Sequence, residues 1–249
     1  MSVLLVDIGN TRVKWALLRG ARVTPGKPVA HEGTGDVLTA LVKRMPLDVE
    51  RVLAVSVAGA RLNRALSQAA RARKLRVEFV KSARRGGGVS NGYKDVWRLG
   101  ADRWVGAIGA HALVGERDVL FAMAGTALTI DLVSAAGQHR GGAIIPGPAT
   151  MVASLLSGTS GIRRRSQGLR ASSRKLFAAD TASALAAGSQ FTAAAFIDRA
   201  VDEAARTLGS RPLLLLSGGG AAGLRRHLRS RAREVPDLVL RGLAVLASG

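Results

Sequence analysis

The sequence has no cysteine, and only 4% of its 249 residues are aromatic. The absence of cysteine excludes a disulfide framework and any thiolate metal site. The scarcity of aromatic residues argues against a surface on which nucleic-acid bases stack. No apolar run is long enough to cross a bilayer. The chain enters an apolar segment at Val3 with no series of basic residues, apolar stretch and cleavage site, so we expect a cytoplasmic protein with no membrane partner.

Acidic residues are also scarce, since 17 Asp and Glu stand against 37 Lys and Arg, for a formal net charge of +20. An excess of this size is typical of proteins that bind nucleic acid. However, Arg greatly outnumbers Lys in a chain rich in Ala and Gly, which indicates a compositional bias, and the basic residues are scattered along the sequence. We therefore expect no nucleic-acid partner, and we interpret the charge as favouring solubility and attracting anionic substrates.

The chain opens with two apolar segments joined by a short turn of small polar residues. Residues 3–8 and 12–18 are predicted strands, and the first of them carries Asp7 just before the turn Gly9, Asn10, Thr11. Backbone amides of such a turn can bind phosphate oxygens, and the carboxylate can hold the Mg²⁺ that accompanies them. An ordinary hairpin has the same pattern. On these residues alone, both interpretations stay open.

The pattern of an apolar strand followed by a glycine turn recurs twice, at residues 125–126 and 217–220. Helical spacing is predicted over residues 35–44, 60–74, 100–114, 149–156, 181–208 and from 237 onward. Further strands are predicted over residues 22–30, 51–57, 75–81, 119–123, 127–133, 141–145, 213–216 and near 234. The alternation predicts an α/β fold, either one doubly wound sheet or two domains. The three glycine turns favour two domains, residues 1–116 and 117–249, with a nucleotide in a cleft between them.

A second candidate acid, Asp102, begins a predicted helix and is followed by Arg103. An Asp at a helix start is most often an N-cap. Next to an arginine, it can also act as a base beside an anion clamp, and phosphoryl transfer needs such a pair. Downstream, residues 158–175 contain six basic residues and no acidic one. We expect this segment to be a mobile loop rather than a cover that draws anions. The four histidines have no ligand spacing, so we expect no histidine metal site.

Four motifs, in their order and spacing, resemble the type III pantothenate kinases, a family that includes the Bvg accessory factor proteins. They are residues 7–11 (DIGNT), 91–93 (NGY) with 100–103 (GADR), 125–131 (GTALTID) and 141–147 (GGAIIPG). The ending at residues 238–243 (LVLRGL) fits as well. Each motif alone is modest, but together they cover the chain from residue 4 to about 188.

The resemblance implies two ribonuclease-H-like domains of the actin, hexokinase and Hsp70 superfamily. It also implies a homodimer that uses ATP with Mg²⁺ to phosphorylate pantothenate, the first step of coenzyme A biosynthesis. The residues it assigns to ATP are Asp7, Ile8, Gly9, Asn10, Thr11, Arg12, Val13, Lys14 and Thr126, with Asp7 near the metal. Those it assigns to pantothenate are Tyr93, Gly100, Ala101, Asp102, Arg103 and Thr181. Asp102 would accept the hydroxyl proton, and Thr181 would reach the site of the second subunit.

One departure from the family pattern concerns the monovalent cation. The family requires K⁺ or NH₄⁺ and usually has an Asp three residues before the Thr of the Gly-Thr-Ala motif, where this chain has Met123. A methionine cannot bind K⁺ in that way. The cation is therefore either lost or held by Asp131 or by backbone carbonyls.

Two further functions are weighed beside the pantothenate kinase. One is a nucleotide-binding accessory protein of transcription, as the Bvg accessory factor name and the basic charge suggest. The other is a different small-molecule kinase of the same superfamily. The short chain and the block from Tyr93 to Arg103 argue against the sugar kinases, which are usually larger.

Overall fold

The computed structural model describes residues 2–31 and 33–249. The chain forms two compact units. Unit 1 contains the described part of residues 1–116 together with residues 135–140 and 237–249, and unit 2 contains residues 117–134 and 141–236. Unit 1 is therefore larger than the predicted domain of residues 1–116, because the end of the chain and a short internal segment pack with it.

A mixed sheet forms the centre of unit 1, with the strand order β3-β2-β1-β5-β6 and with β4 as a further partner of β2. Its strands are β1 (Ser2–Ile8), β2 (Arg12–Arg19), β3 (Arg22–Pro25), β4 (Val29–Ala30), β5 (Val49–Ser56) and β6 (Arg76–Phe79). Strand β1 is antiparallel to β2 and parallel to β5, which makes the first strand of the chain the middle of the sheet. The two opening strands predicted from the sequence are confirmed.

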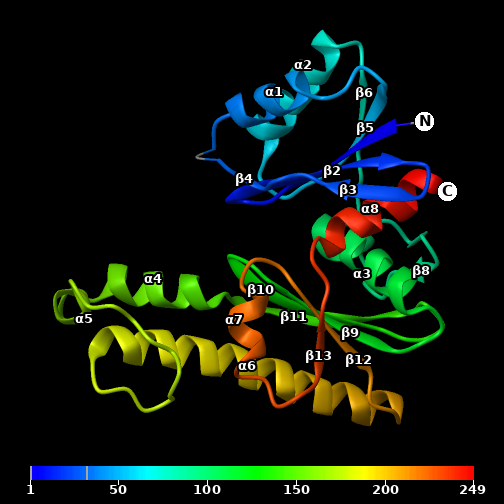
Figure 1. Ribbon diagram of the computed structural model, residues 1–249. Coiled ribbons are helices and arrows are strands. Elements are labelled where there is room, and N and C mark those ends of the chain that lie inside the picture. Colours follow the sequence, from blue (N-terminus) through cyan, green and yellow to red (C-terminus); the bar gives the residue numbers. More distant parts are fainter. Residues whose placement is uncertain (1, 32) are drawn as a thin grey trace. The chain divides into compact units, whose positions relative to one another are not determined.

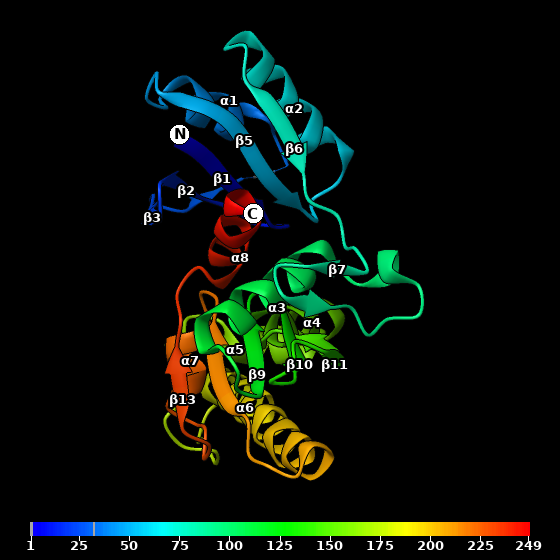
Figure 2. The same cartoon turned by 90° about the vertical axis from the view of Figure 1, so that its right-hand side faces the viewer.

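Helices cover both faces of this sheet. They are α1 (Asp36–Lys43), α2 (Ala60–Ala72), α3 (Ala101–Val114) and α8 (Leu238–Ser248), and a 3-10 turn, η1 (Val96–Arg98), precedes α3. Leu4 and Val6 of β1 form a buried cluster with Leu38 of α1 and Leu66 of α2. Side chains alternate between faces along a strand, so Asp7 lies on the opposite face, where α8 contacts β1. Figure 1 shows α8 on the side of the sheet away from α1 and α2, and Figure 2 shows α2 beside the parallel strands β5 and β6.

The contact between α3 and α8 depends on glycine. A Cβ at Gly242 of α8 would overlap the backbone oxygen of Val105, and a Cβ at Gly109 of α3 would lie 2.5 Å from the backbone oxygen of Leu238. The two helices therefore approach to backbone contact where neither carries a side chain. This packing explains why the C-terminal segment folds with the N-terminal one.

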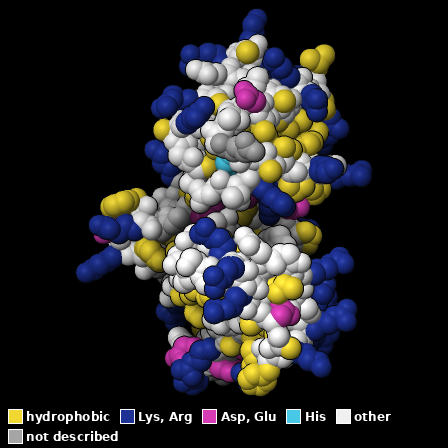
Figure 3. All heavy atoms as spheres, turned by 90° about the vertical axis from the view of Figure 1, so that its left-hand side faces the viewer, with side chains coloured by type: hydrophobic (Ala, Val, Ile, Leu, Met, Phe, Trp, Pro, Cys, Tyr) yellow, Lys and Arg dark blue, Asp and Glu magenta, His cyan; other side chains and the backbone are white. Residues whose placement is uncertain are grey.

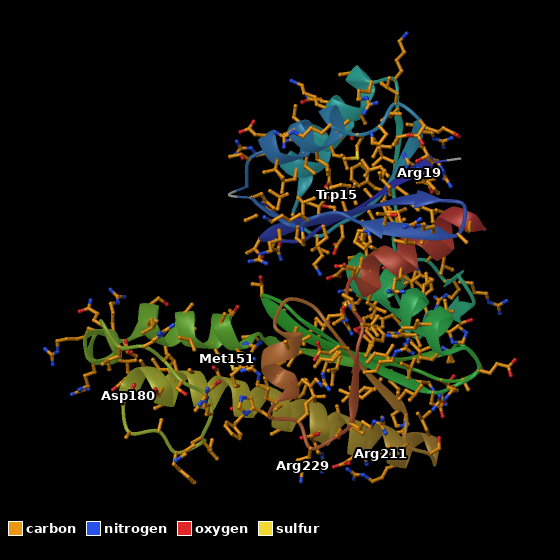
Figure 4. All side chains as sticks on the ribbon, viewed as in Figure 1. Trp15, Arg19, Met151, Asp180, Arg211 and Arg229 are labelled. Atoms are coloured by element: carbon orange, nitrogen blue, oxygen red, sulfur yellow. The ribbon has the colours of Figure 1, made fainter. Side chains whose placement is uncertain are left out.

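The prediction of a single strand over residues 22–30 is wrong, because β3 ends at Pro25 and β4 begins at Val29. The ring of Trp15 fills the space beside Gly26 that a Cβ would need. Its Nε1 also donates to the backbone oxygen of Lys27 at 3.2 Å. Figure 4 shows Trp15 on β2, on the side of the sheet that carries α1 and α2. The indole thus packs against the turn between the two strands, and the Pro25-Gly26 pair is itself typical of a turn.

Unit 2 repeats the sheet topology of unit 1. Its strands are β9 (Val119–Ala124), β10 (Ala127–Val133), β11 (His139–Pro146), β12 (Leu213–Ser217) and β13 (Ala232–Glu234). Their order is β11-β10-β9-β12-β13, in which β9 is antiparallel to β10 and parallel to β12, as β1 is to β2 and β5. The predicted α/β class with a duplicated strand–turn–strand device is therefore confirmed.

One long helix covers a face of the second sheet. The helices of unit 2 are α4 (Pro148–Gly158), α5 (Ser160–Ser166), α6 (Thr181–Leu208) and α7 (Ala221–Arg225). Helix α6 buries Ile197 and Val201 against Leu120 and Ala122 of β9. Figure 4 labels Asp180, the N-cap residue at the start of this helix. It also labels Met151 on α4, and helix α4 packs against α6. The Asp180 carboxylate accepts the amide of Ser183 at 2.8 Å, and this hydrogen bond lowers the pKa of Asp180.

The prediction of a loop throughout residues 158–175 is wrong for its first half, which is the helix α5. Arg163 of α5 donates from Nε to the backbone oxygen of Leu156 at 2.8 Å and from Nη2 to that of Ser157 at 3.2 Å. The last carbonyls of a helix have no partner within the helix. Arg163 of the basic segment therefore provides hydrogen-bond donors for the last carbonyls of α4. A count of charges does not reveal this role.

Basic side chains are spread over the surface. In the face shown in Figure 3, Lys and Arg side chains lie scattered over each unit rather than gathered in one patch. In the part of the chain that the structure describes, no helix is both long enough and apolar enough to cross a membrane.

We predict that Gly242→Ala destabilises unit 1. The new methyl group must displace the backbone of α3, and overpacking of this kind costs about 1–3 kcal/mol in the free energy of unfolding. Urea unfolding followed by circular dichroism measures the change. The matched control is Gly188→Ala in α6, where a Cβ meets nothing within 4 Å. In this control the free energy of unfolding is expected to rise by about 0.5–1 kcal/mol, because alanine is more favourable than glycine in a helix interior. Equal effects of the two substitutions would contradict the packing described for α3 and α8.

Candidate active site

The turn between β1 and β2 offers a backbone amide to solvent. The amide of Gly9 closes the turn by donating to the backbone oxygen of Arg12 at 3.0 Å. The exposed Asn10 has no hydrogen bond from its amide to any residue that the structure describes. Ile8 and Val13 are buried in the core, so only their backbones are available to a ligand. The turn can therefore present Asn10 to an anion such as a phosphate.

His31, which the sequence analysis left without a role, supports this turn from below. Its Nδ1 accepts the amide of Gly33 at 3.2 Å, so Nε2 carries the proton and donates to the backbone oxygen of Gly9 at 2.8 Å. The amide of His31 also donates to the backbone oxygen of Thr11 at 3.1 Å. No spacing rule connects a histidine in an irregular segment to a turn twenty residues earlier, so this contact has no sequence signal.

Asp7 lies at the centre of a cluster of charged groups within unit 1. In the register of β1 and β2 it is opposite Lys14, and both side chains lie on the sheet face away from α1 and α2. The pKa of Asp7 is raised from 3.8 to about 7, mainly by burial; the charge of Lys14 lowers it, and the charges of Asp102 and Asp237 raise it. Asp102 and Asp237 are thus near enough to Asp7 for their charges to disfavour its ionised form.

Asp102 stands in the first turn of α3. Its Oδ1 accepts the amide of Arg103 at 2.8 Å, whereas the N-cap residue, Gly100, makes no side-chain capping bond. A Cβ at Gly100 would lie 2.7 Å from Oδ1 of Asp102. Glycine at this position therefore leaves room for the carboxylate. Asp102 is therefore not the N-cap residue of α3, although its Oδ1 accepts an amide in the first turn of that helix.

Arg103 and Tyr93, two of the residues assigned to pantothenate, contact each other. Nη1 of the buried Arg103 donates to the Tyr93 hydroxyl at 3.1 Å, and its guanidinium carbon lies 5.8 Å from the centre of the tyrosine ring. The imidazole of His139 lies on the same ring, with centroids 5.9 Å apart. The structure thus brings Tyr93 to the helix start that carries Asp102, nine residues further along the chain.

Two residues that the sequence analysis did not assign hold the Tyr93 loop in place. Asn91, quoted there only as part of a motif, accepts the amide of Tyr93 at 2.9 Å through Oδ1 and donates to the backbone oxygen of Ala83 at 3.2 Å through Nδ2. Arg84 donates to the backbone oxygens of Tyr93 and Lys94, both at 2.9 Å. An Asn two residues before the amide it binds is a recognisable turn signal. The arginine contact has no comparable signature.

In unit 2, the glycine turns pack around the β9–β10 turn that carries Thr126. The backbone oxygen of Thr126 accepts the amide of Gly147 at 2.8 Å and the hydroxyl of Thr150 at 2.6 Å. A Cβ at Gly147 would overlap the backbone oxygen of Gly125, and a Cβ at Gly218 would lie too close to the backbone of Ala124. These turns therefore come together because their glycines permit backbone contact.

Met123 of β9 shares a sheet face with two polar residues of β10. It is opposite Thr129 in the register, and Asp131 is opposite Phe121. Asp131 is fully buried and Thr129 nearly so, on the face away from α6. Among the described residues, no group of three His, Cys, Asp or Glu side chains is arranged to hold a metal ion. A cation here, or at Asp7, would therefore need ligands beyond the carboxylates and histidines of the described residues.

Thr181 is the first residue of α6, directly after the N-cap Asp180. Its surroundings anchor the segment before it, because the amide of Ser172 donates to the hydroxyl of Ser183 in the first turn of α6 at 3.1 Å. Thr126 and Thr181 belong to unit 2, whereas the other residues assigned to ATP and pantothenate belong to unit 1. Within unit 1 the structure brings together the hairpin turn, Asp102 and the Tyr93 loop.

The two units with one repeated sheet topology have the fold of the actin, hexokinase and Hsp70 superfamily, as the motifs predicted. Solved structures agree on the fold. An ROK family glucokinase from Streptomyces griseus, in complex with glucose and AMPPNP, matches with a TM-score of 0.55 at 14% identity over 100% of both chains. An ethanolamine utilization protein, EutJ, from Carboxydothermus hydrogenoformans, matches with a TM-score of 0.56 at 12% identity over 99% of this chain and 90% of that one.

Sequence comparison identifies the family. Residues 3–203 match the profile of the type III pantothenate kinases. The type III pantothenate kinase of Nitrosococcus oceani is 36% identical over 98% of this chain and 93% of its own length. That of Janthinobacterium sp. (strain Marseille) is 38% identical over 98% and 97%. The chain belongs to the type III pantothenate kinase family, as the motifs predicted.

We predict that Asp7→Asn stabilises the ligand-free protein in a pH-dependent way. Because the folded-state pKa of about 7 lies above the unfolded value of 3.8, the folded protein binds more protons between these values. The wild-type free energy of unfolding therefore falls as pH rises from about 4 to 7. At about 1.4 kcal/mol for each tenfold change in the ionisation constant, the loss is at most about 4 kcal/mol.

Asparagine cannot ionise, so the stability gain of Asp7→Asn over wild type should grow from pH 5 to pH 8 in urea unfolding experiments. A gain that stays constant with pH would show that Asp7 is not held near neutrality in the folded protein.

Proposed function

We propose that this chain transfers the γ-phosphoryl group of ATP to the primary hydroxyl of pantothenate, with Asp102 as the base. Membership of the type III pantothenate kinase family supports the reaction. The observation that supports the residue roles is that Asp102, at the start of α3, lies close enough to Asp7 of the hairpin for their charges to interact. A kinase needs a base for the acceptor near the groups that bind the phosphates.

The hairpin is proposed to bind the phosphates of ATP through the amide of Asn10 and the ammonium of Lys14, and Thr126 to contact the nucleotide from unit 2. Asp7 fits a Mg²⁺ that also contacts phosphate oxygens, because this ion commonly combines one or two carboxylates with phosphates and water. Burial is the main cause of the raised pKa of Asp7, and the neighbouring charges of Asp102 and Asp237 add to it. When bound, the metal would neutralise charge on the transferred group.

The acceptor side is proposed to consist of Asp102, Arg103 and Tyr93. The hydroxyl oxygen of pantothenate forms a bond to the γ-phosphorus, the bond from that phosphorus to the bridging oxygen breaks, and ADP leaves. Asp102 accepts the hydroxyl proton. Arg103 would bind the carboxylate of pantothenate by charge-assisted hydrogen bonds, and Tyr93, already bonded to Arg103, would line the same place.

A homodimer with Thr181 at the partner's site is part of the proposal. Phe177 is 91% exposed and Leu176 is 49% exposed, only a few residues before Thr181. Apolar side chains of this size on a protein surface commonly mark a contact with another chain. A kinase that draws ATP and pantothenate from metabolism is proposed to work in the cytoplasm. The transcriptional accessory role is less well supported, because the curated relatives compared here are kinases by name.

We predict that Asp102→Asn lowers kcat by about 10²–10⁴-fold, the usual contribution of a general base, while the KM for ATP changes little. A coupled assay with pantothenate, ATP and Mg²⁺ measures both parameters. The matched control is Asp36→Asn, because Asp36 also stands in the first turn of a helix, α1, but is exposed and distant in sequence from the motifs. A near-normal kcat for Asp102→Asn would mean that another group takes the proton.

The departure at Met123 leads to a second expectation for the same assay. We propose that activity depends little on K⁺ or NH₄⁺, and replacing K⁺ by tetramethylammonium should change kcat by less than about twofold. Met123→Asp restores a carboxylate on the face shared with Asp131 and should make the rate respond to K⁺, since hard cations prefer oxygen ligands. Loss of wild-type turnover without K⁺ would show that a cation site persists without this carboxylate.

A further inference from the structure

Asp237 has an unusual backbone conformation for its residue type. Its φ of 56° lies in the left-handed region, as does that of only one other non-glycine residue in the described chain, Lys74 at 57°. Every other described residue with positive φ is a glycine. Lys74 simply follows the end of α2, where such a conformation is common. Asp237 precedes a helix, where an extended backbone is usual. Strain of this kind persists where surrounding structure holds it and often accompanies function.

The ordinary explanation for an aspartate before a helix does not apply to Asp237. It is the N-cap residue of α8, and its backbone oxygen accepts the amide of Arg241 at 3.1 Å. Its carboxylate makes no capping hydrogen bond to the helix. The side chain is therefore directed to something other than the helix start.

The carboxylate of Asp237 faces the hairpin instead. Its Oδ1 lies 3.7 Å from Nζ of Lys14, and about a quarter of each side chain is exposed. This separation is an ion pair but is longer than a hydrogen bond, and Lys14 makes no hydrogen bond through Nζ to any described residue. The ammonium is thus held by charge while its three donors stay available. The charge of Asp237 also reaches Asp7, which is opposite Lys14 in the sheet.

We propose that Asp237 is a positioning residue for the nucleotide phosphates: it holds the Lys14 ammonium beside the β1–β2 turn, so that the C-terminal segment completes the phosphate-binding hairpin. The inference rests on the proposed role of Lys14 in binding ATP. A restrained lysine loses less conformational freedom when it meets a phosphate. Because Asp237 acts through Lys14, its removal should affect ATP binding and leave the acceptor side unchanged.

The first test uses Asp237→Asn, which removes the charge but keeps a residue type that tolerates the left-handed conformation. The KM for ATP should rise by about fivefold, the size of a modest partly buried ion pair. The kcat and the KM for pantothenate should stay within about twofold of wild type. An unchanged or lower KM for ATP would overturn the proposal, because Asp237 would then be dispensable or would repel the nucleotide.

Glycine replacements separate charge from backbone strain. Asp237→Gly relieves the strain and should raise the melting temperature, yet its KM for ATP should rise as in Asp237→Asn. Lys74→Gly is the matched control, since it relieves the other left-handed residue and should leave every KM unchanged. A wild-type KM for ATP in Asp237→Gly would show that the carboxylate has no part in nucleotide binding.

A double-mutant cycle with Lys14→Met tests the route of the effect. If Asp237 acts through Lys14, Asp237→Asn should not raise the KM for ATP further in the Lys14→Met background. If the two substitutions instead raise the KM for ATP independently, so that their fold-changes multiply in the double variant, the proposal is overturned. A wild-type enzyme without pantothenate kinase activity would refute the proposed function itself. If the wild type is active and the KM for ATP is unchanged in Asp237→Asn, only the positioning role is refuted.

Discussion

The register between β1 and β2 is the constraint on which the site in unit 1 depends. Because Asp7 is paired with Lys14, both side chains lie on the same face of the sheet. This is the face opposite α1 and α2, on the side of α3 and α8. Sliding β2 by one residue would turn Lys14 into the core and bring Val13 or Trp15 to the charged side. The buried clusters on either side of the hairpin prevent this slip, since Ile8 and Val13 are fully buried on the opposite face.

Glycine determines how the other elements reach that face. Helix α8 lies on α3 because Gly109 and Gly242 remove the side chains that would separate their backbones. The same close approach puts the start of α8, with Asp237, in the neighbourhood of the hairpin. In unit 2, Gly147 and Gly218 let two turns pack against the β9–β10 turn that carries Thr126. Each unit thus repeats one sheet topology and uses backbone contact to assemble the turns at its functional end.

The sequence was sufficient to predict the strands that have a clear period and the turns that have glycine, because these signals are local. Periodicity located β1, β2, β9 and β10, and motif spacing pointed to Asp7, Asp102 and the family. It failed where a single side chain from elsewhere decides the outcome. Arg163 is such a side chain, because it binds the last carbonyls of α4 from within a segment that looks like a basic loop. The break after Pro25 has a local signal that the prediction overlooked, since a Pro-Gly pair is typical of a turn.

Site residues divide in the same way. Asp102 and Arg103 were recognisable because a helix start beside a glycine is a local signal. His31, Arg84 and Asp237 were not, because each acts on a segment remote in sequence: the β1–β2 turn, the Tyr93 loop and Lys14. Arginines that bind backbone oxygens cannot be told apart by composition in a chain that holds 37 basic residues. What the sequence could not supply is therefore the second layer of contacts that holds the reacting groups in place.

The charge of the chain can be reconciled with an acidic site on electrostatic grounds. A net charge of +20 draws anions from solution, and both ATP and pantothenate are anions. Around Asp7, however, burial and the charges of Asp102 and Asp237 disfavour the ionised carboxylate, and the charge of Lys14 opposes them. If the hairpin binds ATP as proposed, such a site would disfavour a bare triphosphate and favour one that carries a divalent cation, since the cation would offset the charge of Asp7. The general attraction would then bring substrates to the protein, and the surroundings of Asp7 would favour the metal-bearing form of the nucleotide.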